Sequence, residues 1–160
     1  MLELLEAVSA RLVQKKLMLV SAESCTGGMI GAVMTDRPGS SAFYAGGFIT
    51  YSNDLKTRLL DVPEPMLAQY GAVSAAVAQA MAQGALDKTN ADIAISVTGI
   101  AGPDGGSVDK PVGLVYIGYG LKGRPINVSK YNFEGDRGAI RRQTVAAALD
   151  HILKTIEVLE

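Results

Sequence analysis

The spacing of hydrophobic residues predicts alternating helices and strands in the first part of the chain. Apolar side chains recur at helical spacing over residues 2–15, which is typical of an amphipathic helix. An apolar run at 17–22 and a β-branched and aromatic run at 48–52 predict two strands. Between them, residues 29–36 place apolar side chains on one face and predict a second helix. Strands that alternate with helices favour parallel crossover connections.

Three helices are predicted before the next strand. Ser52 or Asn53 can serve as the N-cap of a short one. A second short helix begins in the segment VPEPML, where a proline near the start costs no hydrogen bond. Ser74 is the expected N-cap of a longer, alanine-rich helix.

Three strands and a last helix complete the chain. The strands are predicted at 91–99, 114–120 and 126–133. The last helix is expected to begin near Asp136. The hairpin formed by the last two strands adds an antiparallel strand to the sheet. We therefore expect an α/β fold over residues 1–160, a single domain with three α/β/α layers and a mixed, mostly parallel sheet of about five strands.

Composition narrows the function. The formal net charge of −1 argues against a general nucleic-acid-binding protein, which would carry a basic excess. A single cysteine excludes an internal disulfide, and a single histidine argues against a zinc site built only from protein side chains. The apolar share of 48% is high, and part of it is expected to lie in the interface of a homo-oligomer, a dimer or higher.

No segment has the pattern of a membrane span or a secretion signal. The N-terminal segment has interrupted apolar residues and early acidic ones, unlike a signal peptide. No stretch approaches the roughly 18 uninterrupted apolar residues of a transmembrane helix. We therefore expect a cytoplasmic protein without a membrane partner.

Three polar loops follow predicted strands, and two of them contain glycines. Their sequences are ESCTGG, YSNDLK and TGIAGPDGG. In open α/β sheets, ligands bind beyond the carboxyl ends of the strands. We therefore expect the three loops to converge on one pocket.

The first loop offers two nucleophiles, Ser24 and Cys25. Gly27 and Gly28 allow the backbone to approach a ligand closely, and amides of the following helix can point toward it. A serine placed before such amides has a nucleophile and an oxyanion hole in one segment. The alternative is that Ser24 or Thr26 simply caps the helix. The pattern is not GxSxG, so the nucleophile-elbow argument does not apply.

A nucleophilic serine needs a base. The only histidine, His151, lies in the predicted last helix and is expected to be a structural or surface residue. A Ser–Lys pair is a known alternative, provided that the lysine is desolvated enough to be neutral. Lys56, near Tyr51, is the first candidate, and Lys110 in the glycine-rich loop is the second. For either lysine, the alternative is an ordinary solvated charge.

Two further segments suit an anionic ligand. TGIAGPDGG matches neither a Walker loop nor the dinucleotide fingerprint, yet it suits an anion or ribose, with Thr98 at the strand end. Arg137 and Arg141 lie one turn apart at the start of the last helix and suit a phosphate or carboxylate. A capped helix with solvated arginines is the alternative.

Several sequence blocks together resemble a known family. In chain order they are AESCTGG, GSSAF, GGFITYSNDLK, GAVS, SVTGIAGPDGG, KPVG and GDR…RRQ. They resemble the C-terminal domain family of the competence/damage-inducible protein CinA, from about residue 2 to residue 157. Stand-alone members are nicotinamide-nucleotide amidohydrolases. The resemblance implies an anticodon-binding-like α/β/α fold, a homo-oligomer and hydrolysis of nicotinamide mononucleotide to nicotinate mononucleotide and ammonia in pyridine-nucleotide salvage.

The resemblance also implies residue roles. The enzyme would be a serine amidohydrolase without metal or cofactor, in which Ser24 and Lys56 form the dyad, Tyr51 and Thr98 support catalysis and Cys25 only packs. The residues expected to bind the substrate are Thr26, Gly27, Gly28, Gly47, Asn53, Gly99, Ala101, Gly102, Arg137 and Arg141. The rival hypotheses are a nucleotide-binding module without catalysis and a structural oligomerisation domain.

Overall fold

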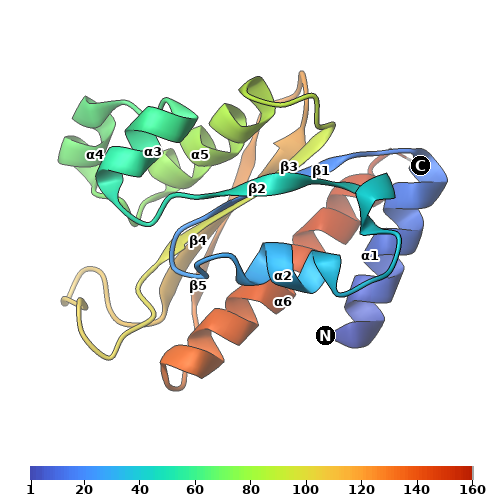
Figure 1. Ribbon diagram of the computed structural model, residues 1–160. Helices are drawn as coiled ribbons and strands as arrows, with labels where there is room; N and C mark the ends of the chain where they lie inside the picture. Colours follow the sequence, from blue (N-terminus) through green and yellow to red (C-terminus); the bar gives the residue numbers. More distant parts are fainter. Residues whose placement is uncertain (160) are drawn as a thin grey trace.

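Helices cover both faces of a five-stranded sheet in the computed structural model, which describes residues 1–159 (Figure 1). The strands are β1 (Leu19–Glu23), β2 (Tyr44–Ile49), β3 (Ile93–Gly99), β4 (Leu114–Leu121) and β5 (Asn127–Asn132). The helices are α1 (Leu2–Lys15), α2 (Met29–Thr35), α3 (Asn53–Leu60), α4 (Glu64–Tyr70), α5 (Ala75–Asp87) and α6 (Arg137–Glu157). A 3₁₀ turn, Ser40–Ala42, precedes β2.

The sheet is mixed, as the sequence predicts. The strand order is β2-β1-β3-β4-β5. β1 pairs in parallel with β2 and with β3, whereas β4 is antiparallel to both β3 and β5. Four of the five strands therefore run in one direction, and only β4 opposes them. The prediction of a mixed, mostly parallel sheet in an α/β/α arrangement is confirmed.

The parallel part of the sheet brings the predicted loops together. Glu23, the last residue of β1, is in register with Ile49 of β2 and Val97 of β3. The carboxyl ends of these three strands therefore lie at the same edge of the sheet. The loops that follow them begin side by side, which is the arrangement that positions ligands in such folds.

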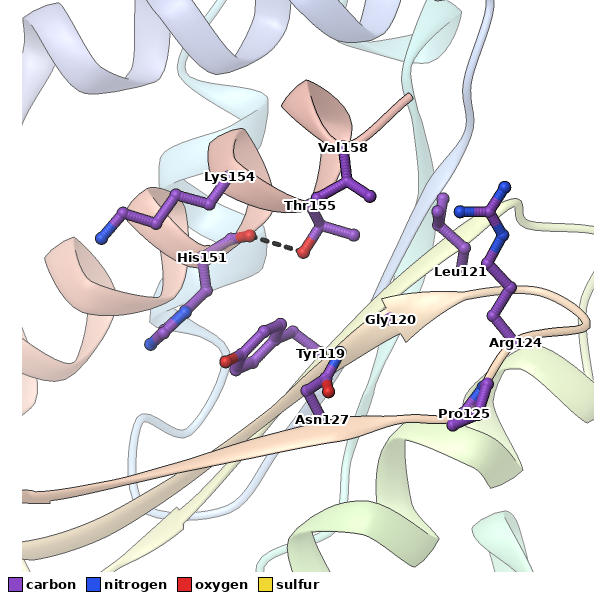
Figure 2. A pocket seen from close by; sticks show the side chains of 10 residues that line it. All are labelled: Tyr119, Gly120, Leu121, Arg124, Pro125, Asn127, His151, Lys154, Thr155 and Val158. Atoms are coloured by element: carbon purple, nitrogen blue, oxygen red, sulfur yellow. Dashed lines mark hydrogen bonds between the residues drawn. The ribbon is translucent and has the colours of Figure 1, made fainter. Parts of the chain in front are cut away.

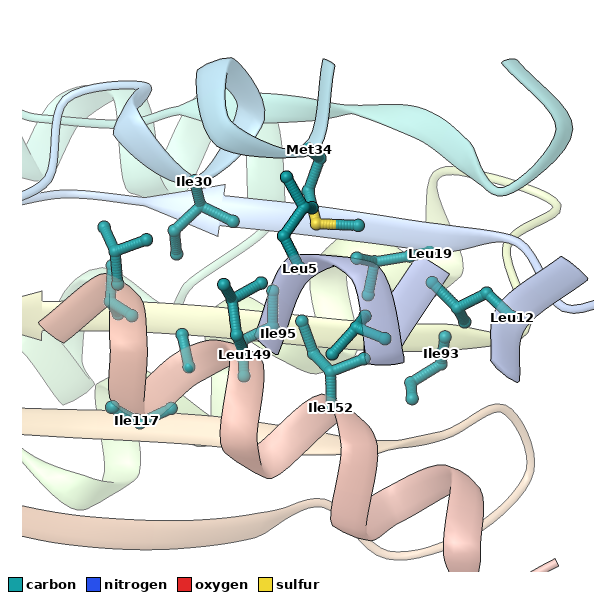
Figure 3. Close-up of a cluster of buried hydrophobic side chains, with 14 of the residues drawn as sticks. Leu5, Leu12, Leu19, Ile30, Met34, Ile93, Ile95, Ile117, Leu149 and Ile152 are labelled. Atoms are coloured by element: carbon teal, nitrogen blue, oxygen red, sulfur yellow. The ribbon is translucent and has the colours of Figure 1, made fainter. Parts of the chain in front are cut away.

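Two cores hold the helical layers on the sheet. On one face, α1, α2 and α6 bury their apolar stripes against β1, β3 and β4, with Leu5, Leu12, Leu149 and Ile152 fully or almost fully buried (Figure 3). The other face packs against α3, α4 and α5 through a second cluster of aliphatic residues. There α5 passes so close to α3 that a side chain at Gly84 would clash with the carbonyl of Leu60.

One predicted strand is misplaced. The run 48–52 is strand only up to Ile49, and β2 instead begins at Tyr44. Its pairing with β1, which starts at Leu19 opposite Tyr44, determines its extent, whereas its own glycines lower the β propensity. The chain then leaves the sheet because Ser52 caps α3, with its Oγ accepting a hydrogen bond from the Leu55 amide. Of the two caps that the sequence allows, Ser52 and Asn53, the structure uses Ser52.

Among residues 1–159, no helix is long and apolar enough to cross a membrane. The same residues contain no group of histidine, cysteine, aspartate and glutamate side chains that could hold a metal ion.

Candidate active site

A pocket of about 230 Å³ lies at the carboxyl ends of β1 and β3, beside the start of α6. Its lining consists of Ser24, Cys25, Tyr51, Lys56, Ala72, Val73, Thr98, Gly99, Ala101 and Arg137. All three predicted loops contribute to it. The expected convergence of these loops is therefore present in the structure.

Ser24 and Lys56 meet inside this pocket. The Nζ atom of Lys56 lies 3.0 Å from Oγ of Ser24. The same nitrogen donates to the backbone carbonyls of Thr50, at 2.8 Å, and Tyr51, at 3.2 Å. Only 1% of Lys56 is exposed, and the described chain gives it no carboxylate partner. Lys56 is therefore a desolvated amine rather than a solvated charge.

Burial changes the protonation of Lys56. Desolvation lowers the pKa of Lys56 from 10.5 to about 8, while the smaller electrostatic effect of Cys25 acts in the opposite direction. A neutral amine keeps two N–H donors and one lone pair. The carbonyls of Thr50 and Tyr51 can take both donors, so that the lone pair is left for the Ser24 hydroxyl. This geometry would let the amine accept the proton of the Ser24 hydroxyl.

Ser24 lies in a tight turn between β1 and α2. Its amide donates to the Val97 carbonyl at 3.1 Å, and its carbonyl accepts from the Gly27 amide at 3.0 Å. Gly27 and Gly28 adopt positive φ values of 57° and 103°, which favour glycine. Gly28 is the N-cap of α2, and no side chain of the cap residue bonds to the helix. The alternative that Ser24 or Thr26 serves as the helix cap is therefore wrong.

Cys25, the other candidate nucleophile, is a buried thiol. Only 6% of it is exposed, and burial raises its pKa from 9.0 to about 11. The thiol is therefore protonated at neutral pH, and the thiolate is the reactive form. Of the two neighbouring candidates, Ser24 alone has a hydrogen bond to a lowered-pKa amine.

Tyr51 and Arg137 lie at the mouth of the pocket. Arg137 Nη2 donates to the Tyr51 hydroxyl at 3.3 Å, and Nη1 donates to the Gly102 carbonyl at 2.9 Å. These bonds join the segments after β2 and β3 to the first residue of α6. Deeper in the pocket, the Thr98 hydroxyl donates to the Ala72 carbonyl at 2.9 Å.

Other predicted residues lie outside the pocket lining. They are Thr26, Gly27, Gly28, Gly47, Asn53, Gly102 and Arg141. Arg141 donates to the carbonyls of Cys25, at 3.1 Å, and Thr26, at 3.0 Å. It therefore holds the Ser24 turn from outside the pocket lining. Asn53 lines a separate depression between α3 and α4. Gly47 lies within β2, where an added side chain would clash with the Ser21 hydroxyl. Binding roles for these residues stay predictions.

Lys110, the second candidate base, is elsewhere. Its Nζ donates to the Tyr70 carbonyl, and the side chain lines a different, more open pocket. Lys110 is therefore not in contact with Ser24. Of the two candidate bases, Lys56 is the one that contacts Ser24.

A further pocket of about 230 Å³ lies between α6 and the β4–β5 hairpin (Figure 2). It is at the far end of the sheet, because Leu121 in its wall pairs with Ile93 at the start of β3. His151 stacks on Tyr119 with a ring-centroid distance of 4.1 Å and hydrogen-bonds to the Tyr131 hydroxyl. The histidine is therefore a packed structural residue, as expected, and takes no part in the Ser24 pocket.

Sequence reasoning missed two important contributors. Glu23 is 1% exposed and its carboxylate organises the turn that carries Ser24. An acidic residue at the end of an otherwise apolar strand was the available signal. The Thr50 carbonyl, which accepts from Lys56, leaves no such signal because any residue carries a carbonyl.

Comparisons with known proteins show which proteins the chain is similar to. A family model described as the CinA C-terminal domain matches residues 1–156. A CinA-like protein of Citrifermentans bemidjiense is 54% identical over 134 residues, covering 84% of this chain and 32% of that protein. The nicotinamide-nucleotide amidohydrolase PncC of Pseudomonas putida is 51% identical over 136 residues, covering 85% of this chain and 84% of that protein.

The solved structures agree as well. The crystal structure of the competence/damage inducible protein CihA from Agrobacterium tumefaciens has a TM-score of 0.93 at 40% identity, covering 97% of this chain and 94% of that one. The chain thus spans about a third of the length of the CinA-like protein and most of the length of the amidohydrolase.

Proposed function

The chain belongs to the CinA C-terminal domain family, and from this premise we propose that it hydrolyses the carboxamide of nicotinamide mononucleotide to nicotinate mononucleotide and ammonia. One observation carries the proposal: the Oγ atom of Ser24 lies 3.0 Å from the desolvated amine of Lys56, inside a pocket. The relative from Pseudomonas putida, whose name states this activity, supports the choice of substrate.

In the proposed acylation step, neutral Lys56 accepts the Ser24 proton while Oγ attacks the carboxamide carbon. The tetrahedral intermediate then breaks its C–N bond, and the departing nitrogen takes the proton from Lys56 and leaves as ammonia. A nicotinoyl ester of Ser24 remains. Lys56 thus acts first as general base and then as general acid.

In the proposed deacylation step, a water molecule attacks the ester and gives its proton to Lys56. The Ser24 oxygen leaves and takes that proton back, which regenerates the enzyme. We assign the developing negative charge of each intermediate to backbone amides of the turn after Ser24.

The mouth of the pocket suits the rest of the nucleotide. Arg137 has five N–H donors, of which the structure engages those directed at Tyr51 and Gly102. The remaining donors and its charge suit the phosphate of a mononucleotide. We therefore assign the pyridine ring to the inside of the pocket and the phosphate to its rim.

The test is an ammonia-release assay on the purified chain with nicotinamide mononucleotide, nicotinamide riboside, nicotinamide and NAD. We expect release from the mononucleotide at the highest kcat/KM. A Ser24→Ala variant serves as the control for a contaminating amidase. Binding of the mononucleotide without ammonia release would instead favour the non-catalytic nucleotide-binding module. Neither binding nor release would favour the oligomerisation domain.

We also propose that the chain forms a homo-oligomer. Apolar side chains around β2 and α3 are markedly exposed, namely Ile49, Tyr51, Leu55 and Leu59. Burying such side chains is what subunit interfaces do. Sedimentation equilibrium of the purified chain tests this, and a monomer at micromolar concentration would contradict it.

A further inference from the structure

We infer that Glu23 is a positioning residue for the Ser24–Lys56 pair, an inference that rests on the proposed amidohydrolase function. Glu23 is the last residue of β1 and directly precedes the nucleophile. Only 1% of it is exposed, yet no lysine or arginine of the described chain pairs with it. A buried carboxylate without a counter-ion has to be held by hydrogen bonds.

Three donors hold the Glu23 carboxylate. Its Oε1 accepts from the Thr26 hydroxyl at 2.6 Å and from the Ile30 amide at 2.8 Å. Its Oε2 accepts from the Gly31 amide at 3.1 Å. The carboxylate therefore joins the end of β1, the middle of the turn and the first turn of α2. The β1–α2 connection is visible in Figure 1.

These bonds replace a missing helix cap. The first amides of a helix have no intrahelical acceptor and are usually satisfied by the N-cap side chain. The N-cap here is Gly28, which has no side chain. Its positive φ and its closeness to Ile49 also disfavour any other residue at that position. Glu23 supplies the acceptor from five residues upstream and so fixes the turn on both sides of Ser24.

The backbone of Glu23 reaches the other member of the pair. Its carbonyl accepts from the Thr50 amide at 2.8 Å, and the Thr50 carbonyl in turn accepts from Lys56 Nζ at 2.8 Å. One residue therefore links the turn that presents Ser24 to the segment that orients Lys56. Small displacements of a catalytic pair reduce the rate strongly, because the reacting groups must be aligned before the reaction.

Glu23→Gln tests the carboxylate with little change in shape. A glutamine has one acceptor oxygen and one NH₂ donor. In either orientation of the amide, the NH₂ faces a backbone donor, Ile30 or Gly31, which loses its acceptor. We expect kcat for nicotinamide mononucleotide to fall about tenfold or more while KM changes less than about threefold, because alignment is lost and the binding surface is kept.

Asp92→Ala is the matched control. Asp92 Oδ2 accepts from the Met18 amide at 2.8 Å, at the end of the sheet opposite the pocket. Its replacement also leaves one backbone donor of the sheet without its acceptor, and we expect a loss of melting temperature similar to that of Glu23→Gln. kcat should remain within about twofold of the wild type, because the Ser24 turn is untouched.

A second readout separates this inference from the proposed function. Phenylmethylsulfonyl fluoride reacts with an activated serine whatever the natural substrate is. We expect the rate at which it modifies Ser24 to fall in parallel with kcat in Glu23→Gln and to be unchanged in Asp92→Ala. If the wild type released no ammonia but reacted with the sulfonyl fluoride, the substrate assignment would fail while the role of Glu23 remained testable.

The outcomes are decisive in each direction. A folded Glu23→Gln variant with wild-type kcat and modification rate would overturn the inference, and so would an equal loss in Asp92→Ala. If Glu23→Gln does not fold, Thr26→Val removes one donor and leaves both helix amides bonded to Glu23; we then expect the same fall in kcat at unchanged KM, on a smaller scale. A wild-type protein that neither releases ammonia from the mononucleotide nor reacts with the sulfonyl fluoride would overturn both proposals.

Discussion

Lys56 Nζ and Ser24 Oγ lie 3.0 Å apart, and the lysine reaches this position only by giving up its solvation. Two backbone carbonyls replace part of the lost water shell. This environment stabilises a neutral amine relative to an ammonium ion, since desolvation penalises the charged form.

The nucleophile is tested by the two neighbouring substitutions Ser24→Ala and Cys25→Ala. We expect the first to lower kcat for ammonia release by about a thousandfold or more, because it removes the atom that is acylated in the proposed mechanism. The second should keep most of the activity, because the Cys25 thiol is protonated at neutral pH. Steady-state kinetics with nicotinamide mononucleotide and a circular dichroism spectrum of each variant decide. A folded but inactive Cys25→Ala variant would contradict the assignment.

The base is tested by Lys56→Arg. Arginine keeps the positive charge but does not deprotonate in proteins, so we expect Lys56→Arg to be as inactive as Lys56→Ala. In the wild type, log kcat/KM should rise with pH below about 8 and level off above it, because only neutral Lys56 accepts the proton. If Lys56→Arg kept more than about a tenth of the wild-type kcat, Lys56 would act only as an electrostatic anchor.

The same lowered pKa affects stability. The folded state releases the Lys56 proton at a pKa of about 8, while the unfolded chain releases it near 10.5. Between these values the unfolded state binds more protons, so the contribution of Lys56 to stability rises with pH and is most unfavourable below pH 8. We therefore expect Lys56→Met to raise the free energy of unfolding at pH 7 more than at pH 10.

Chemical denaturation of both proteins at the two pH values measures this difference. Lys88→Met is a suitable control, because Lys88 is exposed and pairs with Asp61 on the surface. If Lys56→Met changed the free energy of unfolding equally at pH 7 and pH 10, the amine would be charged in the folded protein at both pH values.

Phosphate recognition is tested by Arg137→Ala. A charge-assisted hydrogen bond contributes about 1.5–3 kcal/mol, so the KM for nicotinamide mononucleotide should rise roughly tenfold to a hundredfold. The KM for nicotinamide riboside, which has no phosphate, should change much less. Initial-rate kinetics with both substrates provide the comparison. Equal losses on both would mean that Arg137 acts mainly by holding Tyr51 and Gly102 in place.

Some of the fold and the site could be predicted because they depend on local patterns. Ser24 and Lys56 follow apolar or β-branched segments, and parallel pairing of those segments brings their carboxyl ends to the same edge of the sheet. The boundaries of β2 could not be predicted, since its partner β1 determines them and its glycines carry no strand signal. Contacts made by backbone atoms, such as the Thr50 carbonyl to Lys56, have no sequence signature.

Arg141 illustrates a second limit. Arg141 follows Arg137 by one helical turn, and this spacing predicts that the two arginines share one anion site. In the structure the Arg141 guanidinium donates to the carbonyls of Cys25 and Thr26, more than a hundred residues away in sequence. A guanidinium satisfies carbonyl groups as well as phosphates, so the residue type alone does not separate a binding arginine from a structural one.

Thr50 provides the last prediction, on stability. Its Oγ1 is the one buried side-chain polar atom of residues 1–159 without a hydrogen-bond partner. A buried hydroxyl without a partner costs about 1–3 kcal/mol, and valine has nearly the same shape without it. We therefore expect Thr50→Val to raise the free energy of unfolding by about 1 kcal/mol, which for a chain of this length corresponds to roughly 2–4 °C in Tm. Thr98→Val is the matched control, because the equally buried Thr98 hydroxyl donates to the Ala72 carbonyl and its loss should destabilise the protein. Thermal unfolding of the two variants next to the wild type gives the answer. If Thr50→Val were destabilised as much as Thr98→Val, the Thr50 hydroxyl would be satisfied in solution, with a buried water molecule as the natural partner.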